Sequence, residues 1–368
     1  MRKKQVDLKV SSSTSQQLHN SARRRFWSAR FLVVLLLLTL TACSLASHSP
    51  VEAYPGPYPA ISSTTHPPAT ATVTATLPPT RTPTRTPTRT PTPTSTPTPS
   101  PTATPTPLVF AVIGDYGGNG SPERDVATLV DSWHPEFVLT AGDNNYPAGE
   151  YSTIDQNIGQ FYHSYIFPYR GSYGSGAQEN RFFPSLGNHD WLTNAADPYL
   201  EYFQLPGNER YYDFIWGPVH VFVLDSNSTE PDGYRSDSLQ ARWLQKHMQS
   251  SPAPWQIVIF HHSPYSSGLH GSIEWMRWPF AKWGADAVLS GHDHTYERLQ
   301  VDGIPYFVNG LGGASRYYFD QILPESQVRY NKDYGAMRLV ASPNQLTFEF
   351  YNRQGTLIDT WSLDQEKD

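Results

Sequence analysis

The carboxyl-terminal part of the chain, from Leu108 onward, alternates short apolar runs with amphipathic stretches. Short apolar runs bounded by turn residues indicate buried strands, whereas longer stretches with a period near 3.6 residues indicate helices. Strands that alternate with helices predict a layered α/β fold. The predicted strands cover residues 108–113, 137–140, 181–186, 219–224, 256–260 and 287–290, and the predicted helices cover 121–133, 153–165, 237–249 and 273–283.

After His294 the helical pattern stops and strand patterns continue to the end of the chain. Asp302-Gly303 separates two apolar runs, 296–301 and 304–308, which is a strong hairpin signal. Further strands are predicted at 337–340, 346–351 and 357–361. We expect this antiparallel set to form or complete a second sheet. The result would be a four-layer helix–sheet–sheet–helix sandwich, an α/β fold that some schemes class as α+β.

Residues 1–43 have the pattern of an export signal. Basic residues precede an apolar run from Phe31 to Leu40, which is shorter than the ~20 residues that span a bilayer. The sequence Leu40-Thr41-Ala42-Cys43 follows, and it resembles the bacterial lipobox; Cys43 is the only cysteine among 368 residues. The alternative is an uncleaved anchor with a chance cysteine. We expect a lipid on Cys43 that holds the exported protein to the outer face of the bacterial cell membrane.

Residues 44–107 are dominated by Pro and Thr, and no acidic residue occurs between Glu52 and Asp115. Frequent Pro removes backbone donors, and there is almost nothing apolar to bury, so neither a helix, a sheet nor a core can form. We expect a semi-extended stalk that acts as a spacer, with contact between the stalk and a cell wall left open. The folded domain then covers residues 108–368. The full sequence of 368 residues carries a net charge of −6, which gives no support to nucleic-acid binding, and we expect none.

The apolar strands of the first half each end in residues that can bind a metal. These ends are Gly114-Asp115-Tyr116-Gly117, Gly142-Asp143-Asn144-Asn145-Tyr146, Gly187-Asn188-His189-Asp190, His261-His262 and Gly291-His292-Asp293-His294. Because ligand sites of open α/β sheets form at the carboxyl ends of strands, we expect these side chains at one edge. Carboxylate, amide oxygen and imidazole are ligands for iron, zinc and manganese. A carboxylate such as Asp143 can bridge two ions, and a dinuclear centre can bind a phosphoryl oxygen and supply hydroxide.

The order of these motifs resembles that of the calcineurin-like metallophosphoesterases and, more narrowly, the purple acid phosphatases of the tartrate-resistant type. The resemblance runs from Val109 to about Arg298. Tyr146, three residues after Asp143, matches the tyrosine of the purple subgroup, whose phenolate binds ferric iron. Gly117 stands where other members of the superfamily have a histidine.

The resemblance implies two metal sites that share one carboxylate. Fe³⁺ would be bound by Asp115, Asp143, Tyr146 and His294, and a divalent ion (Fe²⁺, Zn²⁺ or Mn²⁺) by Asp143, Asn188, His261 and His292. It also implies that His189 and His270, which lies nine residues after His261, assist catalysis by contacting phosphate or protonating the leaving oxygen. We expect Asp190 and Asp293 only to orient histidines by hydrogen bonds. His262 and Asp225 are expected to be neighbours rather than ligands.

The function implied is acid phosphatase-like hydrolysis of small phosphate monoesters by attack of metal-bound hydroxide, in an exported, membrane-tethered enzyme. Two alternatives stay open. One is a phosphodiesterase or nucleotidase of the same superfamily, which substrate profiling would separate. The other is a non-enzymatic stalked surface binding protein with a decayed metal site, against which the presence of every expected ligand argues.

Overall fold

The computed structural model describes residues 106–365 of the chain. The predicted export signal with Cys43 and almost all of the predicted stalk lie outside these residues and stay predictions. Within residues 106–365, no helix combines the length and the apolar composition that a bilayer crossing requires.

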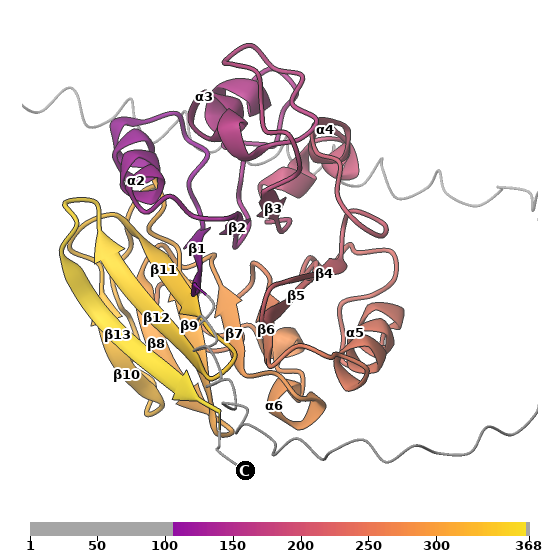
Figure 1. Ribbon diagram of the computed structural model, residues 1–368, viewed down its shortest axis with the longest axis vertical. Helices are drawn as coiled ribbons and strands as arrows, with labels where there is room; N and C mark the ends of the chain where they lie inside the picture. The colour runs from indigo at the N-terminus through magenta and orange to yellow at the C-terminus, as the bar shows by residue number, and fades with distance from the viewer. Residues whose placement is uncertain (1–105, 366–368) are drawn as a thin grey trace, which may run out of the picture. The chain divides into compact units, whose positions relative to one another are not determined.

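Two mixed sheets, packed face to face, form the centre of the domain (Figure 1). The first has the strand order β13-β12-β11-β1-β2-β3, and the second β10-β8-β9-β7-β6-β5-β4. The first sheet contains β1 (Leu108–Ile113), β2 (Val138–Thr140), β3 (Phe182–Pro184), β11 (Gly335–Ala341), β12 (Gln345–Asn352) and β13 (Leu357–Asp364). The second contains β4 (Tyr212–Trp216), β5 (Val219–Val223), β6 (Trp255–Ile259), β7 (Ala287–Ser290), β8 (Tyr296–Val301), β9 (Ile304–Asn309) and β10 (Ser326–Tyr330).

The inner faces of the two sheets are joined by aromatic and aliphatic side chains. Tyr296 on β8 stacks on Phe350 of β12 with ring centroids 4.0 Å apart, and Phe307 on β9 stacks on Phe348 at 4.7 Å. Such pairs contribute about 0.5–1.5 kcal/mol beyond the area they bury. Alternate residues of each strand therefore face a common core, as the period of two in the tail predicts.

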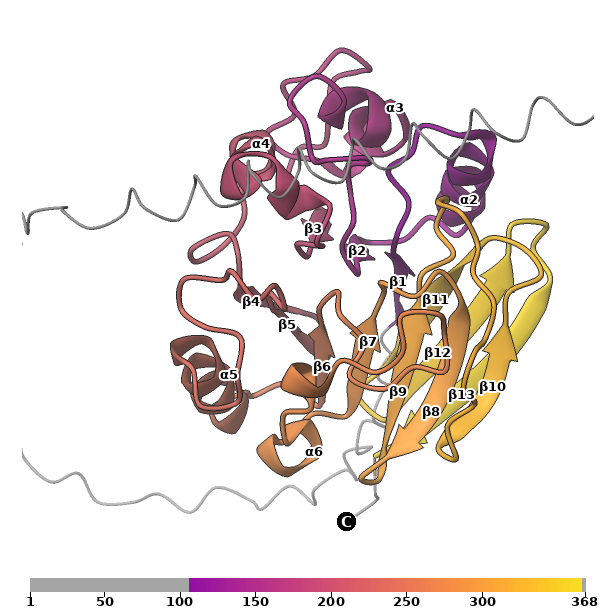
Figure 2. The same ribbon diagram turned by 180° about the vertical axis from the view of Figure 1, so that it is seen from behind.

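Helices cover the outer faces of both sheets, which completes the predicted four layers (Figure 2). On the side of the first sheet lie α2 (Ser121–Ser132), the short α3 (Gln160–Tyr162) and α4 (Asp197–Tyr202). On the side of the second lie α5 (Leu239–Gln249) and α6 (Phe280–Trp283). Leu244 and Met248 of α5 bury against Phe222 and Val258 of the second sheet.

Two of the predicted helices differ from the structure. The stretch 273–283 contains only a 3₁₀ turn at Glu274–Met276 and the short α6, because Pro279 cannot sit inside a helix and instead caps α6. The stretch 153–165 is helical but irregular, with a π-helical turn at Asp155–Gly159 and a 3₁₀ turn at His163–Tyr165 around α3. The strands β4 and β10 and the helix α4 were not predicted.

The strand-rich tail does not form one sheet of its own. Strands β8 to β10 extend the second sheet, whereas β11 to β13 return to the first, where β11 pairs with β1. The strands that carry the motifs are also divided: β1, β2 and β3 lie in the first sheet, and β6 and β7 in the second. We expected the candidate ligands at one edge of one sheet. They lie instead at two facing edges, because each sheet has its own parallel strands and the carboxyl ends of both sets of strands meet at the candidate ligands.

Candidate metal centre

Three of the candidate ligands sit in left-handed backbone at the strand ends. The φ angles are 54° for Asp115, 52° for Asp143 and 70° for His292. This conformation turns the chain sharply after each strand, and outside glycine it costs on the order of 1 kcal/mol or more per residue. Gly142, at φ 84°, precedes Asp143, and a Cβ atom there would lie 2.7 Å from His261 Nδ1. The local sequence thus gives up stability to bring the two sheet edges together.

The first group of side chains gathers around the phenol of Tyr146. Its Oη lies 3.0 Å from Asp143 Oδ2, 3.3 Å from Asp115 Oδ1 and 3.2 Å from His294 Nε2. His294 Nε2 is also 3.3 Å from Asp115 Oδ1. Asp115, Asp143 and His294 each offer a ligand atom within 4.8 Å of the others. Four potential ligands therefore converge on one point.

The second group gathers around His261. Its Nε2 lies 3.0 Å from Asn188 Oδ1, 3.2 Å from His292 Nδ1 and 3.4 Å from Asp143 Oδ2. The oxygen Asp143 Oδ2 thus belongs to both groups, while Asp143 Oδ1 accepts the backbone N–H of His189 at 2.9 Å. The structure therefore brings together all seven candidate ligands, in the two sets that the resemblance implies. Their role as ligands stays a prediction.

The hydrogen bonds of the histidines show that this set fits cations. His261 Nδ1 lies 2.8 Å from the carbonyl oxygen of Ala141, and His294 Nδ1 contacts the carbonyl oxygen of Ser315. A carbonyl only accepts, so each Nδ1 carries a hydrogen, and in the neutral ring the Nε2 lone pair faces the cluster. The lone pair of His261 Nε2 then faces two acceptor oxygens, Asn188 Oδ1 and Asp143 Oδ2, and none of these three atoms carries a hydrogen that could bond the others. Converging lone pairs of this kind are the donor set of a metal site.

Burial and charge set the protonation of the cluster. Burial raises the pKa of the Tyr146 phenol well above its usual range, and the nearby carboxylates of Asp115 and Asp143 raise it further. Burial alone would raise the pKa of Asp115. The attraction and hydrogen bond of His294, the attraction of His261 and the backbone N–H of His292 together outweigh burial and leave this pKa below the ordinary value. The Asp115 carboxylate is therefore charged at neutral pH, and the phenol requires a strong cation to lose its proton.

The two predicted catalytic histidines lie on either side of the cluster. His189 Nε2 is 3.9 Å from Asp143 Oδ2, and its Nδ1 is 2.6 Å from the carbonyl oxygen of Pro147. The exposed ring of His270 stacks on His292, with centroids 4.3 Å apart. Both imidazoles are placed to meet a substrate that approaches the cluster from solvent.

The carboxylates of Asp190 and Asp293 accept hydrogen bonds from backbone N–H groups and from an amide and a hydroxyl side chain, contrary to the expectation that they orient histidine side chains. Asp190 Oδ2 accepts the Gly187 N–H at 2.9 Å and the Asn144 side-chain N–H at 2.8 Å, which ties the second motif to the third. Burial, with the charge of Asp143, raises the pKa of Asp190 to about 7. Asp293 accepts the Ser266 hydroxyl at 2.6 Å and the His270 backbone N–H at 2.8 Å.

Two further residues at the site were not among the predicted site residues. The ring of Tyr317 stacks on His294, with centroids 4.0 Å apart and an interplanar angle of 7°. Glu297 on β8 holds Ser267 in the loop that carries His270, through bonds of 2.6 and 2.8 Å. Only an aromatic-rich loop marks Tyr317 in the sequence. Glu297 lies in the predicted strand 296–301, in the sequence Tyr296-Glu297-Arg298, which is similar to that of plant purple acid phosphatases.

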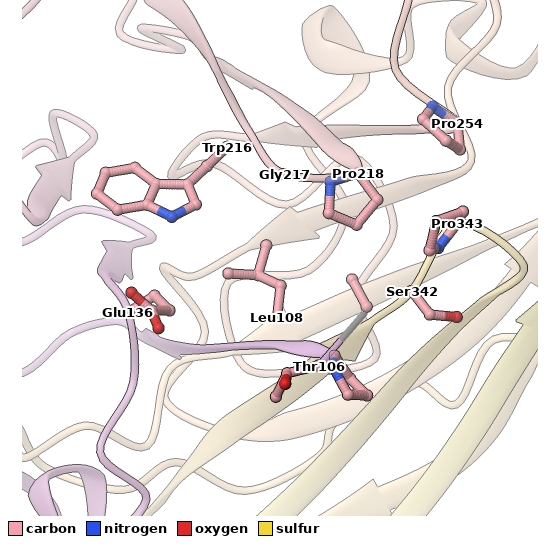
Figure 3. Close-up of a pocket in the computed structure, with 11 residues that line it drawn as sticks. Thr106, Leu108, Glu136, Trp216, Gly217, Pro218, Pro254, Ser342 and Pro343 are labelled. Atoms are coloured by element: carbon pink, nitrogen blue, oxygen red, sulfur yellow. The ribbon is translucent and has the colours of Figure 1, made fainter. Parts of the chain in front are cut away.

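A cavity of 620 Å³ lies at the other end of the strands (Figure 3). Its lining includes Leu108 at the start of β1, Glu136, Trp216 and Pro343. Strand β1 begins at Leu108 beside this cavity and ends just before Asp115, and each residue of a strand advances the chain by ~3.3 Å. The cavity therefore lies at the opposite end of β1 from the candidate metal ligands. Glu136 is the one ionisable side chain in the lining of this cavity, so it offers no comparable ligand set.

Comparisons with known proteins agree with this geometry. Residues 105–296 match the model of the calcineurin-like phosphoesterases. The chain belongs to this family. Among curated proteins, this phosphoesterase is 26% identical to purple acid phosphatase 17 of Arabidopsis thaliana over 293 residues, 68% of this chain and 83% of the relative. It is 27% identical to the Fe(3+)-Zn(2+) purple acid phosphatase 12 of the same plant over 228 residues. This aligned stretch covers 56% of this chain and 46% of that protein.

The fold of this phosphoesterase is that of a solved purple acid phosphatase. The structure of the enzyme PPD1 from yellow lupin (Lupinus luteus) seeds aligns with a TM-score of 0.59 at 20% identity, covering 70% of this chain and 54% of that one. The protein is therefore a purple acid phosphatase-like metallophosphoesterase, a metal-dependent phosphoric monoester hydrolase by its family and homologues.

Proposed function

We propose that the protein hydrolyses phosphate monoesters at a dinuclear centre of Fe³⁺ and a divalent ion, which is Fe²⁺, Zn²⁺ or Mn²⁺. The observation that carries the proposal is the shared oxygen Asp143 Oδ2, which lies between the Tyr146 group and the His261 group. Asp115, Tyr146 and His294 would complete the ferric site, and Asn188, His261 and His292 the divalent site. When bound, two such ions polarise phosphoryl oxygens and supply a hydroxide nucleophile near neutral pH.

The residues of the chain orient the ester and handle the leaving group. His189 is fixed by its backbone bond to Asp143 and by its Nδ1 contact with Pro147, so its Nε2 points to the cluster. In its protonated form this nitrogen donates a hydrogen bond to a phosphoryl oxygen or a proton to the departing alcohol. His270 offers the same chemistry from the opposite side, and Asp293 holds its backbone in place.

The test is metal analysis with an absorption spectrum, followed by turnover of monoesters and diesters. The proposal predicts two ions per chain, a visible tyrosinate-to-iron band, and faster turnover of monoesters. Asn188→Ala should lose the divalent ion and most of the activity, whereas replacement of the exposed His134 should change neither. Strong diester turnover with negligible monoester turnover would instead favour the diesterase. No turnover by the metal-loaded protein, with Asn188→Ala identical to it, would favour a binding protein.

We also propose that the enzyme is exported and tethered to the outer face of the membrane through lipid on Cys43, with residues 44–107 as the spacer. The support is the apolar run followed by Leu40-Thr41-Ala42-Cys43, which contains the only cysteine of the chain. Labelling with a fatty-acid analogue should mark the natural protein and leave Cys43→Ser unmarked. Equal labelling of both forms would contradict the anchor.

A further inference from the structure

A cavity of 680 Å³ opens directly beside the His261 group. It is built from the segments that follow β3, β5 and β6, so it lies at the same carboxyl ends as the metal cluster. The lining residues that matter here are Asn188, Trp191, Arg210, Asn227, His262 and Trp275. Asn188 belongs both to this cavity and to the candidate metal site, so a group attached to a phosphate at the cluster has this space next to it.

Two tryptophans form fixed walls of this cavity. Trp191 Nε1–H donates to Asp225 Oδ2 at 2.9 Å, and Trp275 Nε1–H donates to the carbonyl oxygen of Ser226 at 3.1 Å. Both acceptors are consecutive residues at the end of β5, and both are buried. Because each indole has one N–H and that N–H is already bonded, the rings have only their apolar faces left for contact.

His262 connects these walls to the metal cluster. It is buried, its ring lies 4.6 Å from that of His292 and 5.9 Å from that of Trp275, and the Ser226 hydroxyl holds it at 2.8 Å from Nδ1. A flat ring in the cavity would therefore meet aromatic surface from the tryptophans to the edge of the cluster.

The cavity has no free positive charge in its lining. Arg210 is its one cationic side chain, and its guanidinium is bonded to both oxygens of buried Glu230, at 2.9 and 3.2 Å, and to Asp232 at 3.3 Å. With that charge neutralised, the cavity does not favour a second phosphate or a carboxylate. It suits an uncharged ring.

From this geometry we propose that the cavity binds a planar aromatic group on the alcohol part of the substrate. The inference rests on the proposed monoesterase function and narrows it: the preferred substrates carry one phosphate and an aromatic ring. That ring can be bonded to the ester oxygen, as in an aryl phosphate, or can be the base of a nucleoside monophosphate.

The test compares Trp191→Ala and Trp275→Ala with the natural enzyme on three substrates: phenyl phosphate, adenosine monophosphate and glycerol 2-phosphate. The matched control is Trp216→Ala, because Trp216 lines the cavity at the opposite end of the strands. Each wall variant should lower kcat/KM for the preferred aromatic substrate on the order of tenfold, mainly through KM. Turnover of glycerol 2-phosphate should stay within about twofold. Trp191→Phe should restore most of the loss, since it keeps an aromatic face.

The substrate with the larger loss identifies which aromatic source the cavity takes. Equal effects on all three substrates, or none, would overturn the inference while leaving the phosphatase function intact. If the natural protein hydrolyses no phosphate ester, the proposed function fails instead. Equilibrium binding of phenol and adenosine, followed by tryptophan fluorescence, then decides about the cavity: binding that is lost in both wall variants and kept in Trp216→Ala supports it, and any other pattern overturns it.

Discussion

The loop that presents His270 depends on one buried carboxylate, and Glu297→Ala tests this directly. Glu297 Oε1 accepts the Ser267 hydroxyl at 2.6 Å, and Oε2 accepts the Ser267 backbone N–H at 2.8 Å. Both residues are buried, so the alanine variant leaves two donors of Ser267 without a partner and without water. We expect the segment from Ser263 to His270 to loosen.

The structure sets the size of the effect. Hydrogen bonds to a charged acceptor contribute about 1.5–3 kcal/mol each, so the loss of two costs about 3–6 kcal/mol of unfolding free energy. For a domain of this length each kcal/mol corresponds to a shift of roughly 2–4 °C, so the melting temperature should fall on the order of 10 °C. Glu297→Gln keeps one acceptor oxygen and should lose about half as much.

Hydrogen exchange on the metal-free protein locates the change. Protection should fall first within residues 263–271, and kcat/KM should fall equally for aromatic and aliphatic monoesters, because His270 is displaced while the tryptophan walls remain. Glu349→Ala is the control, since Glu349 pairs with Arg338 in the first sheet, away from this loop. A lowered melting temperature with unchanged protection of residues 263–271 would refute the reasoning and reduce Glu297 to a residue that stabilises the second sheet.

Four further substitutions have defined outcomes. Burial raises the pKa of Asp286 to about 6, so its carboxylate destabilises the fold as the pH rises from about 4 to 6. Asp286→Asn should therefore be more stable in thermal denaturation at pH 8 by at most about 3 kcal/mol, with no advantage at pH 4; a gain independent of pH would exclude the charge as its cause. His294→Ala should remove the visible absorption, while His292→Ala should keep it and lose the second ion; the reverse would mean that the two sites are exchanged. Gly187→Ala should abolish metal binding, as measured by metal analysis, because its Cβ atom would lie 2.1 Å from Asp143 Oδ1; a variant that keeps both ions would show that the loop can shift.

Most strands, though not β4 and β10, could be predicted from the sequence because their apolar runs end at glycines and turn residues. The prediction for 108–113 coincides with β1, and that for 287–290 with β7. The helix at 273–283 failed because its apolar residues are those of a loop that buries Met276 and Trp278 without regular hydrogen bonds. Apolar content alone does not distinguish such a loop from a helix.

The ligand set could be predicted because its residue types follow strand ends in a specific order. The environment of the set could not, because it depends on contacts between segments far apart in the chain. The sequence does not show that Asp225 receives the Trp191 indole N–H, or that Tyr317 stacks on His294. Nor does it show that the motif strands belong to two sheets, since each strand pattern is the same in either arrangement.

The pairing of β1 with β11 has a consequence for how the protein is made. Leu108 pairs with Ala341, so the first strand of the domain to leave the ribosome receives its second neighbour only when nearly the whole chain has been synthesised. Until then β1 is an open sheet edge, which other unfinished chains can join. Pairing between such distant segments is also slow. The strand that leads to Asp115 thus gains its second neighbour only late in synthesis, and an interrupted chain yields an aggregation-prone fragment rather than a partly active phosphatase.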